Sequence, residues 1–388
     1  MGDVIHSLIV PPLLKRKGYK VHFFVDTQFA PIVEKNPFID LVVPIPLRQL
    51  KGIKNWKEKW HNGWKLFKWL QGFNYPLVLD LQGLIKSGII SYLISARSIS
   101  PFPTSNSPFS LPIFQTDKPQ TDNSSSSHSS FPYPTSTETH LSNFFPIQPI
   151  GNTSSQKSLE VDTFHSPQPT SPIRIGPTPA RERIAELFYT QKVKIDPSQV
   201  ATERYIKIAG IEEREFLTNH PKLIGYQPTH FPYLSNYRKN VAFIIGSTWE
   251  CRKLPIETWI SIGKGLKGWN ILIPYYNEKE REYGERIVEK TGGELLRLPL
   301  HLLKALLSQV DLIIGHDTGP TFIGWANNIP NIILYTCTYR NKILENRWCR
   351  SVEVQRGKVD RHLYNGNLLK ANQVLERIEE LTKEGIIG

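Results

Sequence analysis

The turn His316-Asp317-Thr318-Gly319-Pro320 carries the most readable chemistry of the 388-residue sequence. It follows the short apolar run Leu312-Ile313-Ile314, which is typical of a buried strand, and it precedes a predicted helix over 321–326. Backbone N–H groups at a helix start favour anions, so Thr318 and Gly319 are candidates to hold a phosphate or pyrophosphate. Asp-Thr-Gly also occurs as the catalytic turn of aspartic proteases, where the flanking structure is β-rich, and Asp317 could simply cap the helix. The helical context favours the nucleotide site.

The elements that must position this turn alternate between strands and helices, which indicates a parallel, doubly wound α/β fold. Apolar runs predict strands over 21–25, 41–45, 77–81, 241–245, 270–274, 294–298, 312–315 and 332–335. Helical spacing predicts helices over 4–14, 31–35, 84–94, 181–193, 255–266, 278–291, 302–307, 321–326 and 368–383, with a turn at Asn365-Gly366-Asn367. The pattern predicts two Rossmann-like halves that face a central cleft.

The stretch 98–172 has a different composition, since Pro, Ser, Thr and Asn dominate it and no hydrophobic period survives. Such a composition predicts a disordered insertion in the amino-terminal half. The expected domains are a first part of the amino-terminal Rossmann-like domain over 1–97, the insertion over 98–172, the remainder of that domain with a linker over 173–235, and a carboxyl-terminal domain over 236–388.

Polar side chains occur on the loops that the fold would bring to this cleft, where ligands of open α/β sheets bind. Besides the turn itself, they are Asp3, Gln82, Ser247, Thr248, Arg252, Lys253 and Glu280. This set is suited to sugar transfer from a nucleoside diphosphate. It offers a carboxylate as base, cations and helix-start amides to bind a leaving pyrophosphate, and an acidic side chain to bind ribose hydroxyls. We expect neither a metal nor another cofactor, because cations and amides can do this work.

A basic segment over 48–70 places Trp56, Trp60 and Trp64 four residues apart, so that they share one helical face. Five lysines are interspersed with them, at Lys54, Lys57, Lys59, Lys65 and Lys68. The pattern fits a helix that rests on an anionic membrane, and it equally fits a helix whose tryptophans are core and whose lysines are solvated. Stacking on nucleic acid is a further interpretation.

Composition bounds the partners and the compartment. A net charge of +12 indicates an anionic partner, whether nucleic acid, a membrane face or a phosphorylated substrate. The three cysteines, Cys251, Cys337 and Cys349, have no metal-like spacing and argue against a disulfide framework. No apolar run reaches membrane-spanning length and no signal peptide is evident, so we expect a cytoplasmic protein.

Several motifs, in the right order, resemble the lipopolysaccharide heptosyltransferases, which are GT-B-type ADP-heptose transferases. They are Met1-Gly2-Asp3-Val4-Ile5-His6-Ser7, Asp80-Leu81-Gln82-Gly83-Leu84-Ile85-Lys86-Ser87, Arg181-Glu182, Phe188-Tyr189 and Asp317-Thr318-Gly319. The resemblance covers both flanks of the 98–172 insertion but not the insertion itself.

The resemblance implies inverting transfer of L-glycero-D-manno-heptose from ADP-heptose to Kdo of Kdo-lipid A, at the inner face of the inner membrane of a Gram-negative cell and without nucleic acid. Asp3 would be the general base, and Gln82 and Lys86 would bind the acceptor. The donor would be bound by Ser247, Thr248, Arg252 or Lys253, Glu280, Asp317, Thr318 and Gly319. There are three alternatives: heptosyltransferase II, a different nucleotide-sugar enzyme of the same fold, or an inactive truncated homologue that binds a membrane surface.

Three departures from the family pattern bear on activity. The strand that precedes Met-Gly-Asp in the family has no counterpart here, which predicts an amino-terminal sheet without its first strand, ADP binding, and impaired transfer. Phe322 stands where the family often has His, which removes a polar contact at the donor site. The insertion before Arg181 would lie near the acceptor.

Overall fold

The computed structural model describes residues 1–95, 172–354 and 368–388. Apart from residue 172, the expected insertion over 98–172 lies outside the described residues, as does the expected turn at Asn365-Gly366-Asn367. The described residues fall within one compact unit, formed by Met1–Phe109 and Ser171–Gly388.

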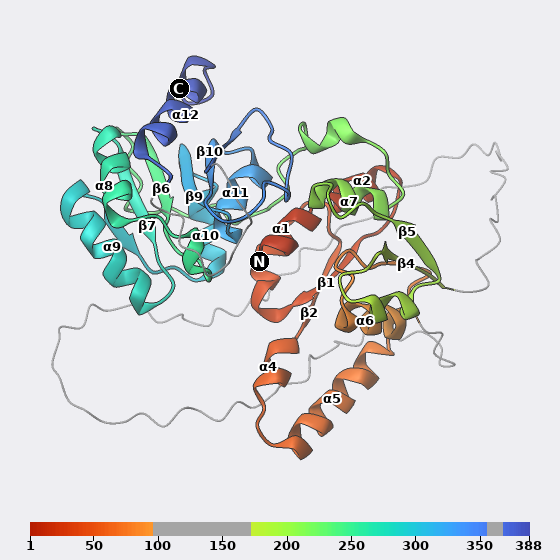
Figure 1. The fold of residues 1–388 in the computed structure, drawn as a ribbon. Helices are drawn as coiled ribbons and strands as arrows, with labels where there is room; N and C mark the ends of the chain where they lie inside the picture. Colours follow the sequence, from red (N-terminus) through yellow and green to blue (C-terminus); the bar gives the residue numbers. More distant parts are fainter. Residues whose placement is uncertain (96–171, 355–367) are drawn as a thin grey trace, which may run out of the picture. The chain divides into compact units, whose positions relative to one another are not determined.

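The carboxyl-terminal half is built on a parallel sheet of six strands in the order β11-β10-β9-β6-β7-β8 (Figure 1). The strands are β6 (Asn240–Ile244), β7 (Asn270–Pro274), β8 (Glu294–Leu296), β9 (Leu312–His316), β10 (Asn331–Tyr335) and β11 (Cys349–Glu353). Relative to the chain, this order is that of a doubly wound Rossmann sheet, whose direction of winding reverses between β6 and β9. Parallel register across that pair sets Ile244 opposite Gly315.

Helices cover both faces of this sheet, as its fully buried central strands β6, β9 and β10 require. Side chains of β6 alternate between the two apolar clusters, Val241 and Phe243 on one face, Ala242 and Ile244 on the other. The first face carries α8 (Ile256–Gly265), α9 (Glu278–Thr291) and α12 (Ala371–Lys383), and the second carries α10 (Leu300–Leu307) and α11 (Gly319–Asn327).

The amino-terminal half contains two short parallel sheets among its described residues, rather than one. One pairs β1 (His22–Asp26) with β2 (Leu41–Ile45), and the other has the order β3-β4-β5, formed by Leu77–Leu79, Ile173–Thr178 and Gln191–Lys194. Its helices are α1 (Gly2–Ser7), α2 (Val10–Arg16), α3 (Ala30–Val33), α4 (Leu47–Gly52), α5 (Trp56–Leu70), α6 (Ile85–Ser95) and α7 (Ala201–Ile208).

Two helix predictions in this half were wrong. The helix expected over 181–193 is a 3-10 helix, η2 (Arg183–Phe188), followed by strand β5, because its periodic Ile184 and Leu187 face solvent instead of a core. The helix expected over 4–14 is two helices, since α2 starts anew with prolines in its first turn, where the missing N–H costs nothing.

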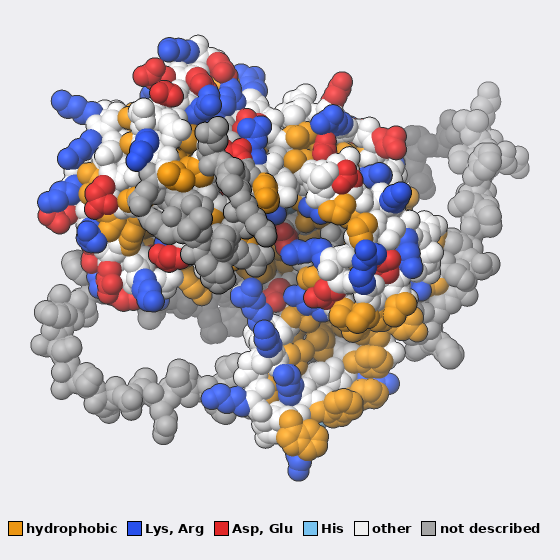
Figure 2. Space-filling model, in the orientation of Figure 1, with side chains coloured by type: hydrophobic (Ala, Val, Ile, Leu, Met, Phe, Trp, Pro, Cys, Tyr) orange, Lys and Arg blue, Asp and Glu red, His pale blue; other side chains and the backbone are white. Residues whose placement is uncertain are grey.

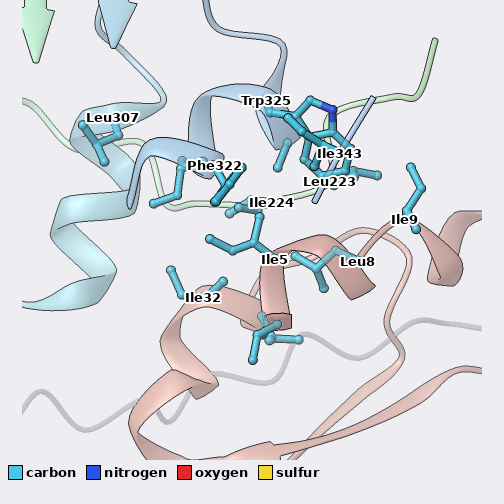
Figure 3. Close-up of a cluster of buried hydrophobic side chains, with 14 of the residues drawn as sticks. Ile5, Leu8, Ile9, Ile32, Leu223, Ile224, Leu307, Phe322, Trp325 and Ile343 are labelled. Atoms are coloured by element: carbon cyan, nitrogen blue, oxygen red, sulfur yellow. The ribbon is translucent and has the colours of Figure 1, made fainter. Parts of the chain in front are cut away.

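The largest apolar cluster joins the two halves (Figure 3). Ile5 of α1 and Leu8, which directly follows α1, pack in the same cluster as Phe322 and Trp325 of α11, and all four side chains are almost completely buried. The His6 ring lies edge-on to Phe322 with ring centroids 4.3 Å apart. The amino-terminal helix is therefore seated on the helix that follows the Asp317 turn.

Candidate active site

The loops after β6 and β9 meet where the winding of the sheet reverses, which is the position at which doubly wound folds bind ligands. Ser247 and Thr248 lie on the first loop, and Asp317, Thr318 and Gly319 lie on the second. Thr318 is the residue that caps α11, and its side chain accepts no capping hydrogen bond from a backbone N–H of the helix. The structure thus brings these five predicted residues to one edge of the sheet.

Arg252 and Asp317 connect the two loops. The Arg252 Nη1 donates a hydrogen bond of 2.6 Å to the backbone oxygen of Asp317, and Nη2 lies 3.4 Å from the Asp317 Oδ2. The guanidinium carbon also lies over the Trp249 ring, 4.2 Å from its centroid. Lys253 instead pairs with the exposed Glu250 at 2.7 Å. Of the two neighbouring cations, Arg252 is therefore the one held at the Asp317 turn.

Burial governs the electrostatics of this turn. Asp317 is only 3% exposed, and burial raises the pKa of its carboxyl, while Arg252 and Thr338 act in the opposite direction. The preceding His316 is fully buried, its pKa is lowered to about 3 by burial, and its ring lies edge-on to Trp259. His316 is accordingly a neutral core residue and not a proton carrier.

Glu280 lies beside the loop after β6. A Cβ atom on Gly246 would come within 2.7 to 2.9 Å of the Glu280 carboxylate, so glycine is what permits the approach. The carboxylate accepts the backbone N–H of Tyr276 at 2.8 Å and the Asn277 side-chain amide at 3.1 Å. These bonds fix the carboxylate at the edge of the loop, where a ribose could meet it.

The start of α11 is in contact with the amino-terminal half. A Cβ atom on Gly319 would meet the Met1 side chain at 2.5 to 2.8 Å. A ligand at this helix start would therefore lie next to Met1. Phe322, by contrast, is 1% exposed and belongs to the core, so the residue that departs from the family pattern packs against His6.

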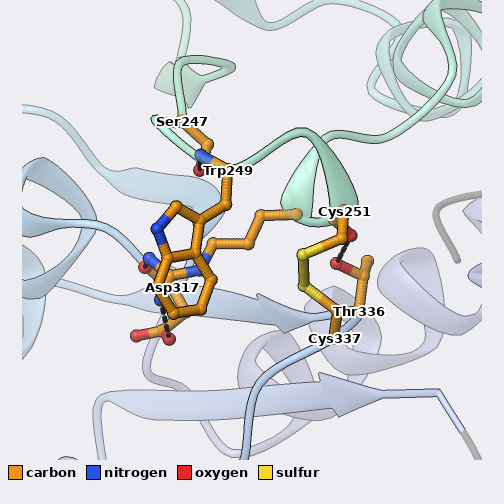
Figure 4. The surroundings of a disulfide bond; sticks show 7 residues. Ser247, Trp249, Cys251, Asp317, Thr336 and Cys337 are labelled. Atoms are coloured by element: carbon orange, nitrogen blue, oxygen red, sulfur yellow. Dashed lines mark hydrogen bonds and ion pairs between the residues drawn. A yellow bond between two sulfur atoms is a disulfide. The ribbon is translucent and has the colours of Figure 1, made fainter. Parts of the chain in front are cut away.

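A disulfide joins Cys251, on the loop after β6, to Cys337, just after β10 (Figure 4). The expectation that argued against disulfides was wrong for these two cysteines. They are 86 residues apart in sequence, but parallel strands end at the same sheet edge, so their loops meet. The Thr336 hydroxyl donates to the Cys251 backbone oxygen at 2.6 Å, and Cys349 remains a buried free thiol.

Asp3 and Gln82 line a second feature, a cavity of about 250 Å³. Three cationic side chains line it too, from Arg181, Arg204 and Lys342. The volume is at the small end of ligand pockets, which span roughly 300 to 1,000 Å³, so the cavity suits one part of a ligand and not a whole nucleotide sugar.

Asp3 is the carboxylate of this cavity and pairs with Arg181 at 3.0 Å. Burial favours the neutral acid, but Arg181, together with His6 and Lys342, holds the pKa of Asp3 below its ordinary value. Asp3 is consequently ionised at neutral pH and able to accept a proton. Burial lowers the pKa of Lys342, whose charge interacts with both Asp317 and Asp3.

The loop that carries Gln82 is held by the buried Asp80. Its Oδ1 accepts the backbone N–H groups of Gln82 at 2.9 Å and Gly83 at 3.1 Å. Its Oδ2 accepts the hydroxyls of Ser87 at 2.8 Å and Tyr189 at 2.7 Å. Two separate sequence motifs therefore form one hydrogen-bonded unit.

Glu182 adds to that unit by accepting the backbone N–H of Ile85 at 2.7 Å, at the start of α6. Lys86, predicted with Gln82 as an acceptor contact, is exposed in the first turn of α6 and is not part of the cavity lining. The structure brings Gln82 to Asp3 but does not bring Lys86 there.

Arg204 and Lys342 were not predicted from the sequence. Each is one basic residue among many, and nothing in their local spacing marks them. They meet because the backbone oxygens of Asn341 and Lys342 accept the N–H groups of Ala201 and Thr202 at 2.9 and 3.2 Å, which caps α7. Among the described residues, no group of three or more His, Cys, Asp or Glu is arranged to hold a metal ion.

The fold, with two α/β halves that each contain parallel sheets, is that of the GT-B-type glycosyltransferases. A solved structure of E. coli heptosyltransferase WaaC with ADP is similar over 98% of this chain and 96% of its own, with a TM-score of 0.62 and 19% identity. The solved structure of E. coli ADP-heptose lipopolysaccharide heptosyltransferase II is similar over 99% of this chain and 96% of its own, with a TM-score of 0.60 and 15% identity.

Sequence comparison narrows this class. Residues 168–356 match the sequence model of glycosyltransferase family 9 (heptosyltransferase), and the chain is a glycosyltransferase. Lipopolysaccharide heptosyltransferase 1 of Campylobacter coli is 24% identical over 89% of this chain and 84% of its own length. The Pseudomonas aeruginosa protein of the same name is 22% identical over 86% of this chain and 76% of its own length.

Proposed function

We propose that this glycosyltransferase moves L-glycero-D-manno-heptose from ADP-heptose to Kdo of Kdo-lipid A, with inversion, in lipopolysaccharide inner-core synthesis. The observation that carries the proposal is the cavity in which Asp3 and Gln82 lie with three cations. A cationic cavity suits the carboxylate of Kdo. The Asp3 carboxylate of this cavity interacts electrostatically with Asp317. Asp317 lies on one of the loops where a doubly wound fold binds nucleotides.

In this proposal Asp3 is the general base. Its carboxylate takes the proton of the acceptor hydroxyl while that oxygen attacks the anomeric carbon, and the bond from that carbon to the ADP oxygen breaks on the opposite face. The Arg181 guanidinium, 3.0 Å from Asp3, keeps the base ionised.

The leaving ADP is assigned to the carboxyl-terminal half. Thr318 and Gly319 offer the helix-start N–H groups to its phosphates, Arg252 supplies the compensating charge, and Ser247 and Thr248 line the adjoining loop. Glu280 reaches the ribose hydroxyls. Arg252 is preferred to Lys253 because Lys253 is engaged by Glu250.

The same proposal sets the compartment and the domains. The acceptor domain comprises 1–97 and the remainder within 173–235, a range that also includes the linker. The nucleotide-sugar domain comprises 236–388, and the protein acts in the cytoplasm at the inner face of the inner membrane. Within the part of the chain that the structure describes, no helix is both long and apolar enough to span a bilayer. An acceptor anchored in lipid would then be met from the membrane surface.

The decisive experiment follows ADP release from ADP-heptose with Kdo-lipid A as acceptor, and with an acceptor that already carries the first heptose. Release with only the first acceptor is expected, and release with only the second would assign the reaction of heptosyltransferase II. Asp3→Asn should lower kcat by about 100-fold or more, as loss of a general base does, while ADP affinity stays unchanged. Glu213→Gln is the matched control, since Glu213 is an exposed carboxylate paired with Arg16. Full activity of Asp3→Asn would overturn the assignment of the base.

A further inference from the structure

The basic helix α5 exposes its tryptophans instead of burying them. Trp56 and Trp60 are each 72% exposed and Trp64 is 51% exposed. The face that α5 does bury is formed by Leu66 and Leu70, in a small cluster with residues such as Ile45 and Leu93. Of the interpretations that the sequence left open, the one that placed the tryptophans in the core is therefore wrong.

The exposed indoles form a coherent apolar stripe. A four-residue spacing puts all three on one side of a helix, and the Phe67 ring stacks on Trp64 with centroids 5.2 Å apart. Together they expose on the order of 300 to 500 Å², which by itself matches the largest apolar patch of a typical monomer. Figure 2 shows hydrophobic side chains along this side of the molecule, over α5 and towards α6.

Neighbouring elements extend the apolar surface. The helix α6 packs against both α5 and η2. It exposes Ile89 and Tyr92, and η2 exposes Ile184 and Leu187. The surface is thus wider than one helix.

Lysines border the stripe. Between Lys54 and Lys68 the sequence has five lysines and a single acid, Glu58. The Lys57 Nζ lies 6.0 Å from the Trp56 ring centroid, and the Lys68 Nζ lies 5.1 Å from that of Trp64. In the described part of the chain, none of the five lysines forms an ion pair with a carboxylate.

We propose that this α5 surface, Trp56, Trp60 and Trp64 with the lysines beside them, docks the protein onto an anionic phospholipid bilayer. Indoles favour the boundary between headgroups and acyl chains, where their apolar rings leave water while their N–H groups stay hydrated. Long lysine side chains lie along apolar surface and keep their ammonium groups among the lipid phosphates. A helix of this pattern lies in the plane of the membrane surface.

The charge pattern disfavours the two other occupants. A symmetric pair of copies joined through α5 would bring two sets of five lysines together, which repel. Single-stranded nucleic acid is bound in grooves that track its backbone, whereas these indoles project from a convex helix. A bilayer is flat, negatively charged and apolar beneath its surface, so it complements both features at once.

The test is flotation of the full chain with vesicles of phosphatidylcholine, either alone or mixed with phosphatidylglycerol. Neither ADP-heptose nor the Kdo-lipid acceptor is present, so this result is independent of the proposed reaction. We expect binding to the mixed vesicles only, weakened about tenfold by raising the salt from low to high concentration. The variant Trp56→Ser/Trp60→Ser/Trp64→Ser should lose binding by about 100-fold or more, and Lys57→Glu/Lys68→Glu by about tenfold.

Matched controls separate the α5 surface from general stickiness and charge. Tyr237→Ser/Tyr276→Ser removes two aromatic side chains that are 98% and 84% exposed elsewhere, and it should bind as the unchanged protein does. Lys264→Glu/Lys267→Glu makes the same charge change on and just after α8. Unchanged thermal unfolding would show that each variant is folded.

Three results would overturn the proposal. They are no binding of the unchanged protein to anionic vesicles, equal losses in the α5 variants and their controls, and displacement of vesicles by an oligonucleotide that binds more tightly. A dimer that dissociates in the tryptophan variant, measured by light scattering, would assign the surface to a second copy of the chain instead.

Discussion

The ion pair of Arg252 with Asp317 allows a prediction that separates stability from ligand binding. Asp317 is 3% exposed and the Arg252 side chain is 15% exposed, so replacing Arg252 leaves a carboxylate buried without its cation. Breaking a buried pair from one side costs about 3 to 5 kcal/mol, and the partial exposure of Arg252 favours the lower end. We therefore expect Arg252→Met, which keeps most of the volume, to lower the free energy of unfolding by about 3 kcal/mol at pH 7.5.

The cost should depend on pH in a defined direction. Burial raises the pKa of Asp317 above its unfolded value, so the folded chain keeps this proton to a higher pH than the unfolded chain does. Stability contributed by such a group is lost as pH rises from the unfolded to the folded pKa. Without Arg252 the folded pKa rises further, and the loss extends to higher pH. The cost of Arg252→Met should therefore be smaller at pH 4.5 than at pH 7.5, because the raised pKa favours the neutral acid of Asp317 as the pH falls.

The double variant Arg252→Met/Asp317→Asn removes both charged partners of the ion pair. With the buried charge removed, most of the lost stability should return and the pH dependence should vanish. ADP affinity, measured by calorimetry, should stay low in both variants, because the proposed phosphate cation is missing from each. Urea unfolding of the unchanged protein and the variants at both pH values measures the stability terms. An equal cost at the two pH values would refute the coupling, and recovery of ADP affinity in the double variant would refute the role of Arg252.

Two further predictions concern the disulfide and a buried lysine. Cys251→Ser/Cys337→Ser should lower the free energy of unfolding by about 2 to 4 kcal/mol, since the bond closes a long loop of the unfolded chain. A reductant should bring the unfolding midpoint of the unchanged protein to that of the variant. An unfolding midpoint that does not respond to reductant would contradict this prediction. Burial lowers the pKa of Lys304 to about 8, next to Glu34 and Lys35, and unfolded lysine titrates near 10.4. The folded chain thus loses this proton first, and stability should rise by about 2 kcal/mol from pH 7 to pH 10 relative to Lys304→Met; parallel pH curves for the two proteins would exclude it.

The carboxyl-terminal sheet was the part of the fold most open to prediction. Strands buried on both faces are continuous apolar runs, and β6, β9 and β10 are all of this kind. The strand β11 escaped because it lies at the sheet edge and includes Arg350 and Ser351, which interrupt any apolar run. Prediction therefore succeeded where burial on both faces dictates composition and failed where an edge relaxes it.

The amino-terminal half was harder to predict for a related reason. The strand β4 has the sequence IRIGPT, in which glycine and proline argue against a strand, and β5 has the sequence QKVK, which is mostly exposed. Both pair only within a sheet of three short strands. Their pairing comes from tertiary contact, as in the bond between the Tyr189 hydroxyl and Asp80, and not from local preference.

The candidate site divides in the same way. Motifs identified the Asp317 turn and the Asp80–Ser87 loop because each needs its residue types locally, a helix start in one case and a carboxylate that ties its own loop in the other. The cations Arg204 and Lys342 and the disulfide depend on loops that are distant in sequence. No local spacing encodes such meetings.

Lys342 connects the two parts of the candidate site. The pair of Asp3 with Arg181 lies wholly in the amino-terminal half, and that of Asp317 with Arg252 lies wholly in the carboxyl-terminal half. Each pair can form without the other, and the contact between α1 and α11 that joins the halves is apolar and carries no charge of its own. Lys342 interacts with both carboxylates. Its charge is therefore an electrostatic link between the proposed base and the turn assigned to the leaving group.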